Sequence, residues 1–475
     1  MQHSRRILFA TFTILLAAQA SLARPPATLQ ADVAKILNRP SLRCAHVGII
    51  IMSLPDGEVW YSSNPDRLFL PASNVKLFVA AAALDQLTPQ FRYQTHVRWA
   101  PSPQDGVLRG DIFIKGYGDP ALLFTHIAAL AESVRDSGIS HITGRVVADD
   151  TAFDSVRYGA GWMLEDLPWY YAAEISALSL NGNSLQVIVR PGPAAHRPAV
   201  VTVSPPTTYM DIQADVTTCP TGSYIGINVE RPLGTRIVKV RGSTVPGARP
   251  VVERLSVPDP ALWAAHVFTE RLRACGVQVD GEPALGRELA LGEIRLRHHS
   301  PPLKEIVATM LKHSDNLMAE QLLKTLGAQT TGNGTVEDGL AVVNRFLRKA
   351  GVASACVPHL ADGSGLSRYN LASPRHIASL LRFMDRQPHR SAWLNALPVA
   401  GVSGTLEGRM TDSPAAGIAR AKTGTMFAVS ALSGYASTRN GRRVCFSILV
   451  NNFVAPTREI RQAQDDIVAA IARAR

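Results

Sequence analysis

Two kinds of hydrophobic pattern alternate along the chain and predict its main elements. Continuous apolar runs, HVGIIIMSL at 46–54 and VCFSILVNN at 444–452, are typical of strands that are buried on both faces. Each run lies next to a second strand-like segment, EVWYSS at 58–63 or AVSALSGYAST at 428–438, across a short turn that contains glycine. We therefore expect an early hairpin and a late hairpin that share one antiparallel sheet.

Helical periodicity marks the segments around these hairpins, where apolar residues recur every three or four positions. The expected helices lie at 27–38, from about Ser73 to 84, within 300–327, and at 336–350, 374–386 and 456–475. Gly351 ends the helix at 336–350, because glycine is the residue that most often follows a helix end. The first and last helices are expected to cover the shared sheet.

The middle of the chain has a different hydrophobic pattern. From about 88 to 290, short alternating strands such as GVLRGDIFIKG and GTRIVKVRG are separated by glycine and proline, which is typical of half-buried strands. We predict one domain from 24–87 and 291–475, interrupted by an inserted β-rich region at 88–290. Two small domains are expected in this insertion, at about 88–170 with 250–290 and at 171–249.

The first 23 residues are typical of a signal peptide. Arg5-Arg6 forms a positive segment, Ile7 to Ala18 an apolar one, and Ser21-Leu22-Ala23 a small-residue cleavage site. The Arg-Arg pair also loosely resembles a twin-arginine signal, so both export routes stay open. Removal of residues 1–23 lowers the net charge from +11 to +9. The mature protein is expected to be exported and periplasmic, or otherwise extracytoplasmic and wall-associated.

The charge distribution narrows the class of partner. Basic residues are scattered singly, and they form no run or patch that would indicate nucleic-acid binding. A net charge of +11 is also compatible with peripheral contact to a polyanionic surface such as a bacterial wall or membrane. Only nine of the 49 basic residues are lysines, so a lysine within a motif carries more information than usual.

The cysteines and histidines do not indicate a metal site. Five cysteines (Cys44, Cys219, Cys275, Cys356 and Cys445) are widely spaced, and no His-Glu-x-x-His is present. His298-His299 is an adjacent pair, and adjacent side chains point apart in most conformations, which is unsuitable for one ion. No metal and no other cofactor is expected.

The segment PASNVKLFVAAAAL at 71–84 combines a nucleophile with a base. Ser73 and Lys76 lie three positions apart, which puts both side chains on one face of a helix. A serine hydroxyl needs an adjacent base to become a nucleophile, and lysine can act as that base only when neutral. Burial and a neighbouring cation would have to lower the pKa of Lys76 by roughly three units. Alone, this pair also fits a helix-capping serine beside a solvated lysine.

Two further motifs favour the catalytic interpretation of Ser73 and Lys76. Ser314-Asp315-Asn316 lies between helical segments, and Lys422-Thr423-Gly424-Thr425 immediately precedes a strand. Ser-x-Asn is weak evidence, because Ser62-Ser63-Asn64 also matches it. The three motifs in the order Ser-x-x-Lys, Ser-x-Asn and Lys-Thr-Gly resemble the signature of the active-site serine penicillin-recognising enzymes.

Other segments narrow the resemblance to one family. GYGDPAL at 116–122, SALSLNGNSL at 176–185, DGSGLSRYN at 362–370 and LPVAGVSGTLEGRM at 397–410 resemble D-alanyl-D-alanine carboxypeptidases/endopeptidases, the class C low-molecular-mass penicillin-binding proteins. The 241 positions between Ser73 and Ser314 also fit this family, which carries inserted domains there. The resemblance implies an α+β fold: a β-lactamase/transpeptidase-like domain with an antiparallel sheet covered by helices and carrying inserted β-rich domains.

The resemblance also implies a catalytic role for the first two motifs. Ser73 would attack the carbonyl group of the penultimate D-alanine of a peptidoglycan peptide and become an acyl-ester. Lys76 would take its proton, Ser314 would relay a proton to the leaving amine, and Asn316 would hold the peptide amide of the substrate. A β-lactam antibiotic would acylate the same serine.

The third motif is implied to bind the substrate. Lys422 would attract the terminal carboxylate and help to keep Lys76 neutral, while the hydroxyl groups of Thr423 and Thr425 would bind that carboxylate. Gly424 belongs to the same binding strand. The backbone N–H groups of Ser73 and Thr425 would form the oxyanion hole.

Three alternatives remain at this point. A Ser-His-Asp hydrolase of the α/β-hydrolase class is disfavoured because the chain has no Gly-x-Ser-x-Gly motif. A serine β-lactamase would share the motifs but would hydrolyse a penicilloyl-ester quickly. A non-catalytic wall-binding or antibiotic-sensing protein would not need an activated nucleophile.

Two residue groups outside the motifs each have two interpretations. The glycine-rich loop at 362–370 favours turn structure, with a position at the edge of a cleft as the alternative. Four aromatic residues could line a cleft for glycan or peptide, although packing between domains is the simpler interpretation. These are Trp162, Trp169, Tyr170 and Tyr171.

Overall fold

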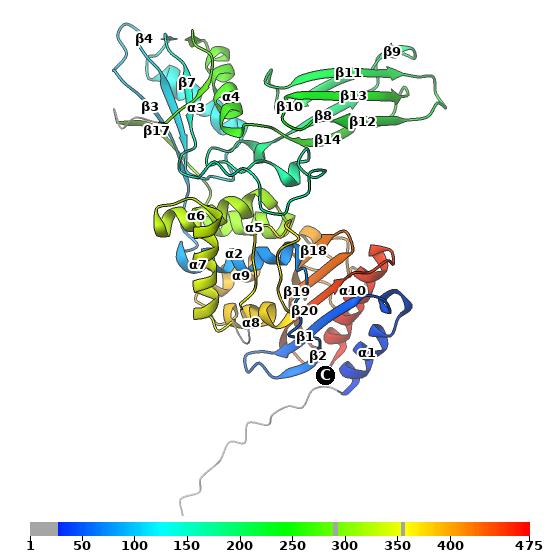
Figure 1. The fold of residues 1–475 in the computed structure, drawn as a ribbon. Helices are drawn as coiled ribbons and strands as arrows, with labels where there is room; N and C mark the ends of the chain where they lie inside the picture. Colours follow the sequence, from blue (N-terminus) through cyan, green and yellow to red (C-terminus); the bar gives the residue numbers. More distant parts are fainter. Residues whose placement is uncertain (1–26, 288–292, 353–356) are drawn as a thin grey trace, which may run out of the picture.

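The computed structural model describes residues 27–287, 293–352 and 357–475. The predicted signal peptide at 1–23 and Cys356 lie outside the described residues. Both ends of the described chain build the lower part of the molecule, and the middle of the chain forms two lobes above it (Figure 1).

A five-stranded antiparallel sheet forms the centre of the lower part. Its order is β18 (Arg420–Met426), β19 (Val429–Ser437), β20 (Arg443–Asn451), β1 (His46–Ser53) and β2 (Val59–Ser63). Strand β1 pairs with β20 over its whole length, from His46 opposite Asn451 to Ser53 opposite Val444. The predicted union of the early and late hairpins in one sheet is therefore confirmed.

Both faces of this sheet are covered by helices, which explains why β1 is a continuous apolar run. Ile49 and Ile51 pack on one side with α1 (Ala27–Leu37) and α10 (Thr457–Arg473). Ile50 and Met52 point to the other side, because side chains alternate along a strand.

On that second side lies a larger helical layer. It contains α2 (Val75–Gln86), α5 (Leu303–His313), α6 (Asn316–Thr331), α7 (Val336–Lys349), α8 (Pro374–Met384) and α9 (Arg390–Ala396). Ten consecutive residues of α2, from Val75 to Leu84, are buried, so this helix forms the middle of the core. Side chains fix the starts of α7 and α8: Thr335 and Ser373 each accept a backbone N–H as N-caps.

The first inserted lobe combines sheets with two long helices. A five-stranded mixed sheet has the order β16 (Ala284–Leu285), β7 (Val146–Asp149), β5 (Ile112–Gly116), β3 (Gln94–Trp99) and β17 (Ile294–His299). A small sheet contains β15 (Gln278–Val279), β6 (His141–Ile142) and β4 (Val107–Leu108). The helices α3 (Phe124–Asp136) and α4 (Pro260–Ala274) pack against each other. The sequence pattern predicts only short strands in this region, so these two helices are an addition to the predicted fold.

The second lobe consists of two small sheets. One has the order β10 (Val200–Ser204), β8 (Ser184–Arg190) and β14 (Val251–Ser256). The other has the order β12 (Gly226–Glu230), β13 (Ile237–Thr244), β11 (Asp211–Thr218) and β9 (Arg197–Pro198). Strand β14 pairs with β8, so it belongs to the second lobe, whereas residues 250–290 were assigned to the first inserted domain. One apolar core extends through both lobes. The proposed limits of two small inserted domains stay a prediction.

No helix within the described residues is long and apolar enough to cross a membrane. Four cysteines in the described part of the chain, Cys44, Cys219, Cys275 and Cys445, carry free thiols.

Candidate active site

Ser73 lies in a single 3₁₀ turn, η2 (Ala72–Asn74), directly before α2. Two glycines allow other segments to approach this turn. A Cβ atom on Gly424 of β18 would lie 2.9 Å from the carbonyl oxygen of Pro71, and one on Gly365 would lie 2.0 Å from that of Ala72. Both glycines are therefore needed for close backbone contact, and Ser73 is held between the β18 strand and the loop at 362–370.

Lys76 is completely buried beside Ser73 and has three polar contacts. Its Nζ lies 2.9 Å from Ser73 Oγ, 2.7 Å from Asn316 Oδ1 and 2.6 Å from the carbonyl oxygen of Ser364. The last two partners can only accept hydrogen bonds. A neutral amine that donates its two N–H groups to them therefore directs its lone pair at the Ser73 hydroxyl.

Burial lowers the pKa of Lys76 to about 8, and the charges of Asp362, Glu320 and Asp315 oppose this shift. Burial, followed by the charge of Asp362, raises the pKa of Glu320 to about 7. The carboxylate of Glu320 accepts the N–H groups of Gly363 at 2.9 Å and Ser364 at 2.8 Å. Glu320 thus orients the Ser364 carbonyl group that binds Lys76.

The loop at 362–370 is built around the buried carboxylate of Asp362. This group accepts the backbone N–H groups of Gly365 at 2.8 Å and Ser367 at 2.6 Å, and the side-chain amide of Asn370 at 2.8 Å. The indole of Trp162, from the inserted region, also donates to Asp362, at 3.0 Å. Asp362 therefore organises a turn, and this turn presents the backbone that binds Lys76.

A second lysine and serine form the opposite side of the site. Ser314 ends α5 in the left-handed conformation, with φ 59° and ψ 37°. The buried Lys422 donates to Ser314 Oγ at 2.9 Å and to the Thr423 carbonyl oxygen at 2.7 Å. Burial and then the charge of Lys76 lower the pKa of Lys422 well below its usual value.

Lys76 and Lys422 each disfavour the positive charge on the other, because the repulsion between two nearby cations is mutual. Three carboxylates lie close to Lys76 and favour its proton, whereas no carboxylate of a described residue contributes to the pKa shift of Lys422. Burial is the first cause of the shift at both lysines, and the expected help of Lys422 in keeping Lys76 neutral stays a prediction.

Asn316 connects the inserted region to Lys76. Its Oδ1 accepts from Lys76, and its Nδ2 donates to the carbonyl oxygen of Tyr171 at 2.7 Å. Asp315 accepts the N–H of Met318 at 2.9 Å and caps α6, which fixes the Ser-x-Asn turn. The structure thus brings the predicted residues together in two hydrogen-bonded groups, Ser73 with Lys76 and Asn316, and Ser314 with Lys422. Ser73 and Ser314 line the same cleft.

The family of the chain follows from comparison with known proteins. The model of the D-Ala-D-Ala carboxypeptidase 3 (S13) family matches residues 29–474. The chain belongs to this S13 family. It is a serine-type D-alanyl-D-alanine carboxypeptidase/endopeptidase, as the three motifs indicated.

Two curated relatives and one solved structure illustrate the similarity. The D-alanyl-D-alanine carboxypeptidase of Actinomadura sp. is 37% identical over 442 residues, covering 90% of this chain and 82% of the relative. The D-alanyl-D-alanine carboxypeptidase DacB of Haemophilus influenzae is 27% identical over 419 residues, covering 86% of each chain. Penicillin binding protein 4 of H. influenzae has the same fold, with a TM-score of 0.81 at 24% identity over 92% of this chain and 97% of that one.

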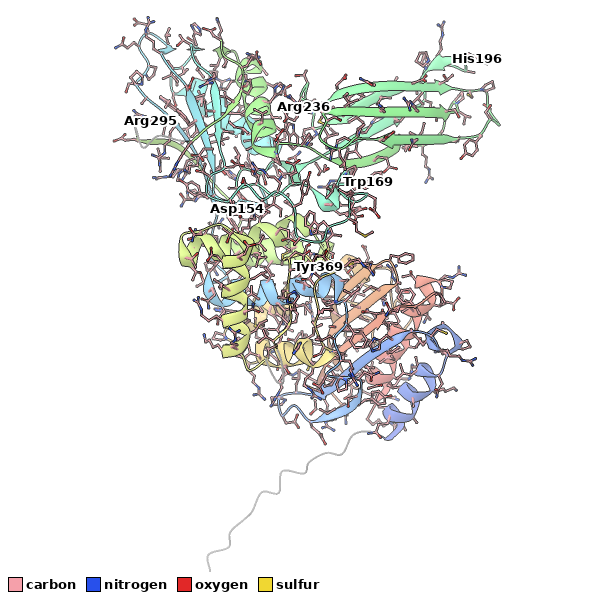
Figure 2. The ribbon with its side chains drawn as sticks, in the orientation of Figure 1. Asp154, Trp169, His196, Arg236, Arg295 and Tyr369 are labelled. Atoms are coloured by element: carbon pink, nitrogen blue, oxygen red, sulfur yellow. The ribbon has the colours of Figure 1, made fainter. Side chains whose placement is uncertain are left out.

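The candidate active-site cleft of this S13 enzyme has two parts, and Ser73 and Ser314 line both of them. One part, of about 370 Å³, is lined by Thr405, Arg409, Thr423, Gly424, Thr425 and Arg461. The other, of about 700 Å³, lies between the 362–370 loop and the inserted segment 163–171, and Tyr170 and Tyr171 line it. Figure 2 shows Trp169 of the inserted segment above Tyr369 of the 362–370 loop.

Sequence reasoning missed several groups that organise the site of the enzyme. Glu320 and Lys324 stand four positions apart, a spacing typical of an exposed helical ion pair, yet both are buried. Lys324 instead pairs with Asp154 of the inserted region. The carbonyl groups of Ser364 and Tyr171 had no signal at all, because every residue carries one.

Proposed function

We propose that Ser73 is the nucleophile and Lys76 the general base for cleavage of the peptide bond between two D-alanines. The arrangement around Lys76 supports this proposal: two carbonyl acceptors hold its N–H groups, and its remaining valence faces Ser73 Oγ at 2.9 Å. With a pKa of about 8, on the order of a tenth of Lys76 is neutral at pH 7. That fraction removes the Ser73 proton as the hydroxyl attacks the carbonyl carbon.

The terminal carboxylate of the substrate influences the protonation state of Lys76 through Lys422. A carboxylate bound beside Lys422, Thr423 and Thr425 favours the protonated form of Lys422. Because Lys422 and Lys76 are close enough for one charge to disfavour the other, a protonated Lys422 disfavours the proton on Lys76. Substrate binding thereby increases the fraction of the neutral base.

The remaining steps use the second lysine–serine pair. The backbone N–H groups of Ser73 and Thr425 stabilise the oxyanion, and Ser314, which accepts from Lys422, relays a proton to the leaving amine. D-Alanine then leaves, and water hydrolyses the acyl-ester on Ser73. In the carboxypeptidase reaction the leaving group is D-alanine, and in the endopeptidase reaction it is a cross-linked peptide.

The substrate class that we propose is the peptidoglycan stem peptide or its cross-link. The acyl side of the peptide occupies the larger part of the cleft beside Tyr170 and Tyr171, and the leaving group occupies the smaller part beside Thr423 and Thr425. β-Lactams acylate the same serine, since a β-lactam complex is known for penicillin binding protein 4 of H. influenzae. The predicted signal peptide implies that the enzyme acts outside the cytoplasm.

The test uses a peptide that ends in D-Ala-D-Ala and benzylpenicillin. We expect release of D-alanine from the peptide and a one-to-one penicilloyl-ester on Ser73 that lasts minutes or longer. The thiazolidine ring remains in the cleft and hinders water, whereas departing D-alanine leaves its path open. Rapid turnover of benzylpenicillin, with no D-alanine released from the peptide, would contradict the proposal.

A further inference from the structure

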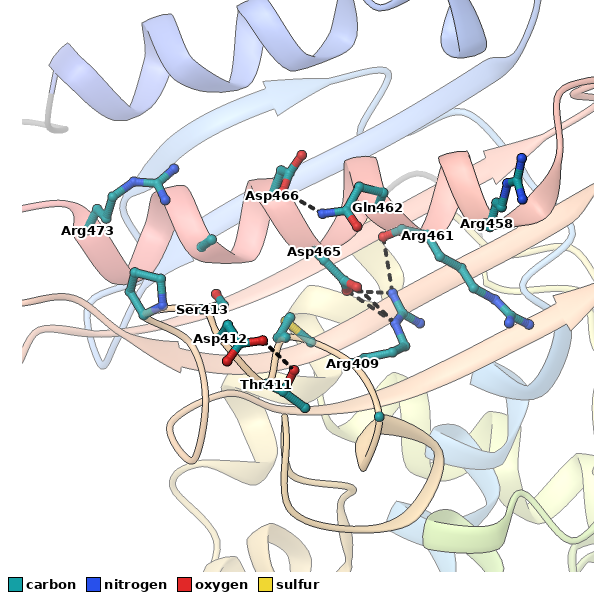
Figure 3. Close-up of a pocket in the computed structure, with 14 residues that line it drawn as sticks. Arg409, Thr411, Asp412, Ser413, Arg458, Arg461, Gln462, Asp465, Asp466 and Arg473 are labelled. Atoms are coloured by element: carbon teal, nitrogen blue, oxygen red, sulfur yellow. Dashed lines mark hydrogen bonds and ion pairs between the residues drawn. The ribbon is translucent and has the colours of Figure 1, made fainter.

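The leaving-group part of the cleft continues into a groove along the last helix. This groove, of about 530 Å³, lies between the loop at 408–414 and α10 (Figure 3). Arg409 and Arg461 line both the groove and the smaller part of the active-site cleft. Two guanidinium groups therefore stand where the two spaces join.

Arg409 is held in place by an aspartate. Its Nε lies 3.2 Å from both carboxylate oxygens of Asp465, and its Nη2 lies 2.7 Å from Asp465 Oδ1. Only 15% of the Arg409 side chain and 12% of the Asp465 side chain are exposed. Figure 3 shows these contacts together with one to the carbonyl oxygen of Arg461, at 3.4 Å. The negative charge of Asp465 is thus neutralised by Arg409.

Arg461 has a different environment, although it stands one turn before Asp465 on α10. Its guanidinium forms no ion pair with any described aspartate or glutamate, and its Nη2 donates to Thr425 Oγ1 at 3.2 Å. Arg461 is exposed, and partial desolvation together with the charge of Arg409 lowers the pKa of its guanidinium below the usual value, while the charge of Asp465 opposes this shift. An anion bound at this point would favour the charged guanidinium group.

The contact with Thr425 also orients that hydroxyl group. A threonine hydroxyl has one proton to donate and lone pairs to accept. Because Thr425 Oγ1 accepts from Arg461, its own proton stays free to be donated, and Thr425 lines the cleft. Thr423 stands on the same face of β18, since side chains alternate along a strand, and its Oγ1 donates to Thr405 at 2.8 Å. Thr425 and Arg461 together therefore present donors at the leaving-group end of the site.

We propose that Arg461 is a specificity-determining residue that binds, with Thr425, the carboxylate on the carbon next to the scissile nitrogen. This inference rests on the proposed function, because it assigns the carboxylate of that leaving group. Arg461 lies on α10, 36 positions after Thr425, and belongs to none of the three motifs. Arg409 acts through position and charge: it neutralises Asp465, which would otherwise compete with the substrate carboxylate for Arg461.

The experiment compares two thioesters that differ only in the charge of the leaving group. One is an N-acyl-D-alanyl ester of thioglycolic acid, and the other is the corresponding ester of thioglycolamide. For Arg461→Gln we expect kcat/KM with the carboxylate thioester to fall at least about tenfold, as for loss of a charged hydrogen bond. With the neutral thioester the change should be less than about twofold.

The rate of hydrolysis of the acyl-enzyme provides a second readout. Both thioesters form the same acyl-Ser73, from which the leaving group has departed, so Arg461→Gln should leave this rate unchanged. Arg461→Lys should restore part of the preference for the carboxylate, because the charge is kept and the planar fork is lost. Equal losses with both thioesters would indicate a structural role of Arg461 and would overturn the inference.

Arg458→Gln is the matched control. Arg458 is exposed on the same helix and lines the groove, but it does not line the cleft beside Ser73. The same change of charge should therefore alter kcat/KM by less than about twofold for either thioester. A loss equal to that of Arg461→Gln would assign the effect to long-range electrostatics and would also overturn the inference. If the unaltered enzyme acylated Ser73 with neither thioester, the proposed function itself would fail.

Discussion

Two lysine–serine pairs lie at the cleft. The distance from lysine Nζ to serine Oγ is the same in both pairs, but the groups around them differ. Lys76 and Ser73 are 2.9 Å apart, as are Lys422 and Ser314, and both lysines are completely buried. Lys76 lies near the carboxylates of Asp362, Glu320 and Asp315, whereas burial and another cation act on Lys422. The comparison teaches that neighbours beyond the pair set the proton affinity of each lysine, which is why we propose different roles for Lys76 and Lys422.

The strongest test of this difference exchanges each serine for alanine. Ser73→Ala should abolish the penicilloyl adduct, because no nucleophile remains, while Ser314→Ala should still form an adduct at a reduced rate. Intact-mass spectrometry after incubation with benzylpenicillin measures both outcomes, and thermal unfolding near that of the unaltered enzyme confirms the fold. An adduct on the Ser73→Ala protein would remove the distinction between the two pairs.

Exchanging the lysines should have the next largest effect. Lys422→Ala should slow acylation by at least about 100-fold, or roughly 2.7 kcal/mol, because the charge that attracts the carboxylate is lost. Lys422→Arg keeps that charge and should be milder, whereas Lys76→Arg should be severe, since arginine stays protonated and cannot act as a base. Stopped-flow acylation with a fluorescent penicillin measures these rates. Equal damage from both arginine variants would show that the two lysines have the same role.

The pH dependence of acylation should follow Lys76. Its pKa is lowered to about 8, so a fall in pH below this value adds a proton to the base and removes the active form. The acylation rate should fall about tenfold for each pH unit below 8 and level off above it. Measurement of the rate between pH 6 and 9 gives the profile. A flat profile over this range would mean that the base is not Lys76.

Glu320→Gln should have the smallest effect on rate. The charge of Glu320 raises the pKa of Lys76, so its removal should move the pH profile toward lower pH. A glutamine can accept only one of the two backbone N–H groups that Glu320 binds, so the maximal rate should also fall, by less than about tenfold. Asp315→Asn is the matched control, because asparagine also caps a helix and only the charge is lost. Its shift should have the same direction and be smaller, since Asp315 contributes less than Glu320. A shift toward higher pH in either variant would contradict the electrostatic account.

Local patterns predicted much of the catalytic part. The helix expected at 336–350 is α7 at Val336–Lys349, and the one expected at 374–386 is α8 at Pro374–Met384, because amphipathic periodicity and caps are local properties. The helices α3 and α4 of the inserted region were missed, since short strands around them dominated the pattern. Local patterns also gave no indication of the ion pair between Lys324 and Asp154, because the two residues are 170 positions apart.

The sequence by itself determined which side chains we propose to carry the chemistry: two serines, two lysines, an asparagine and the threonines of one strand, in three motifs that keep their order. Only the tertiary structure decided which neighbours surround each of these groups and therefore which role we propose for it. The Ser364 carbonyl group, Glu320 and Arg461 reach the site from segments far apart in the chain, and a backbone carbonyl carries no residue identity. The physical reason is that the proton affinity of a buried lysine depends on desolvation and on distances to other charges, and folding alone sets both.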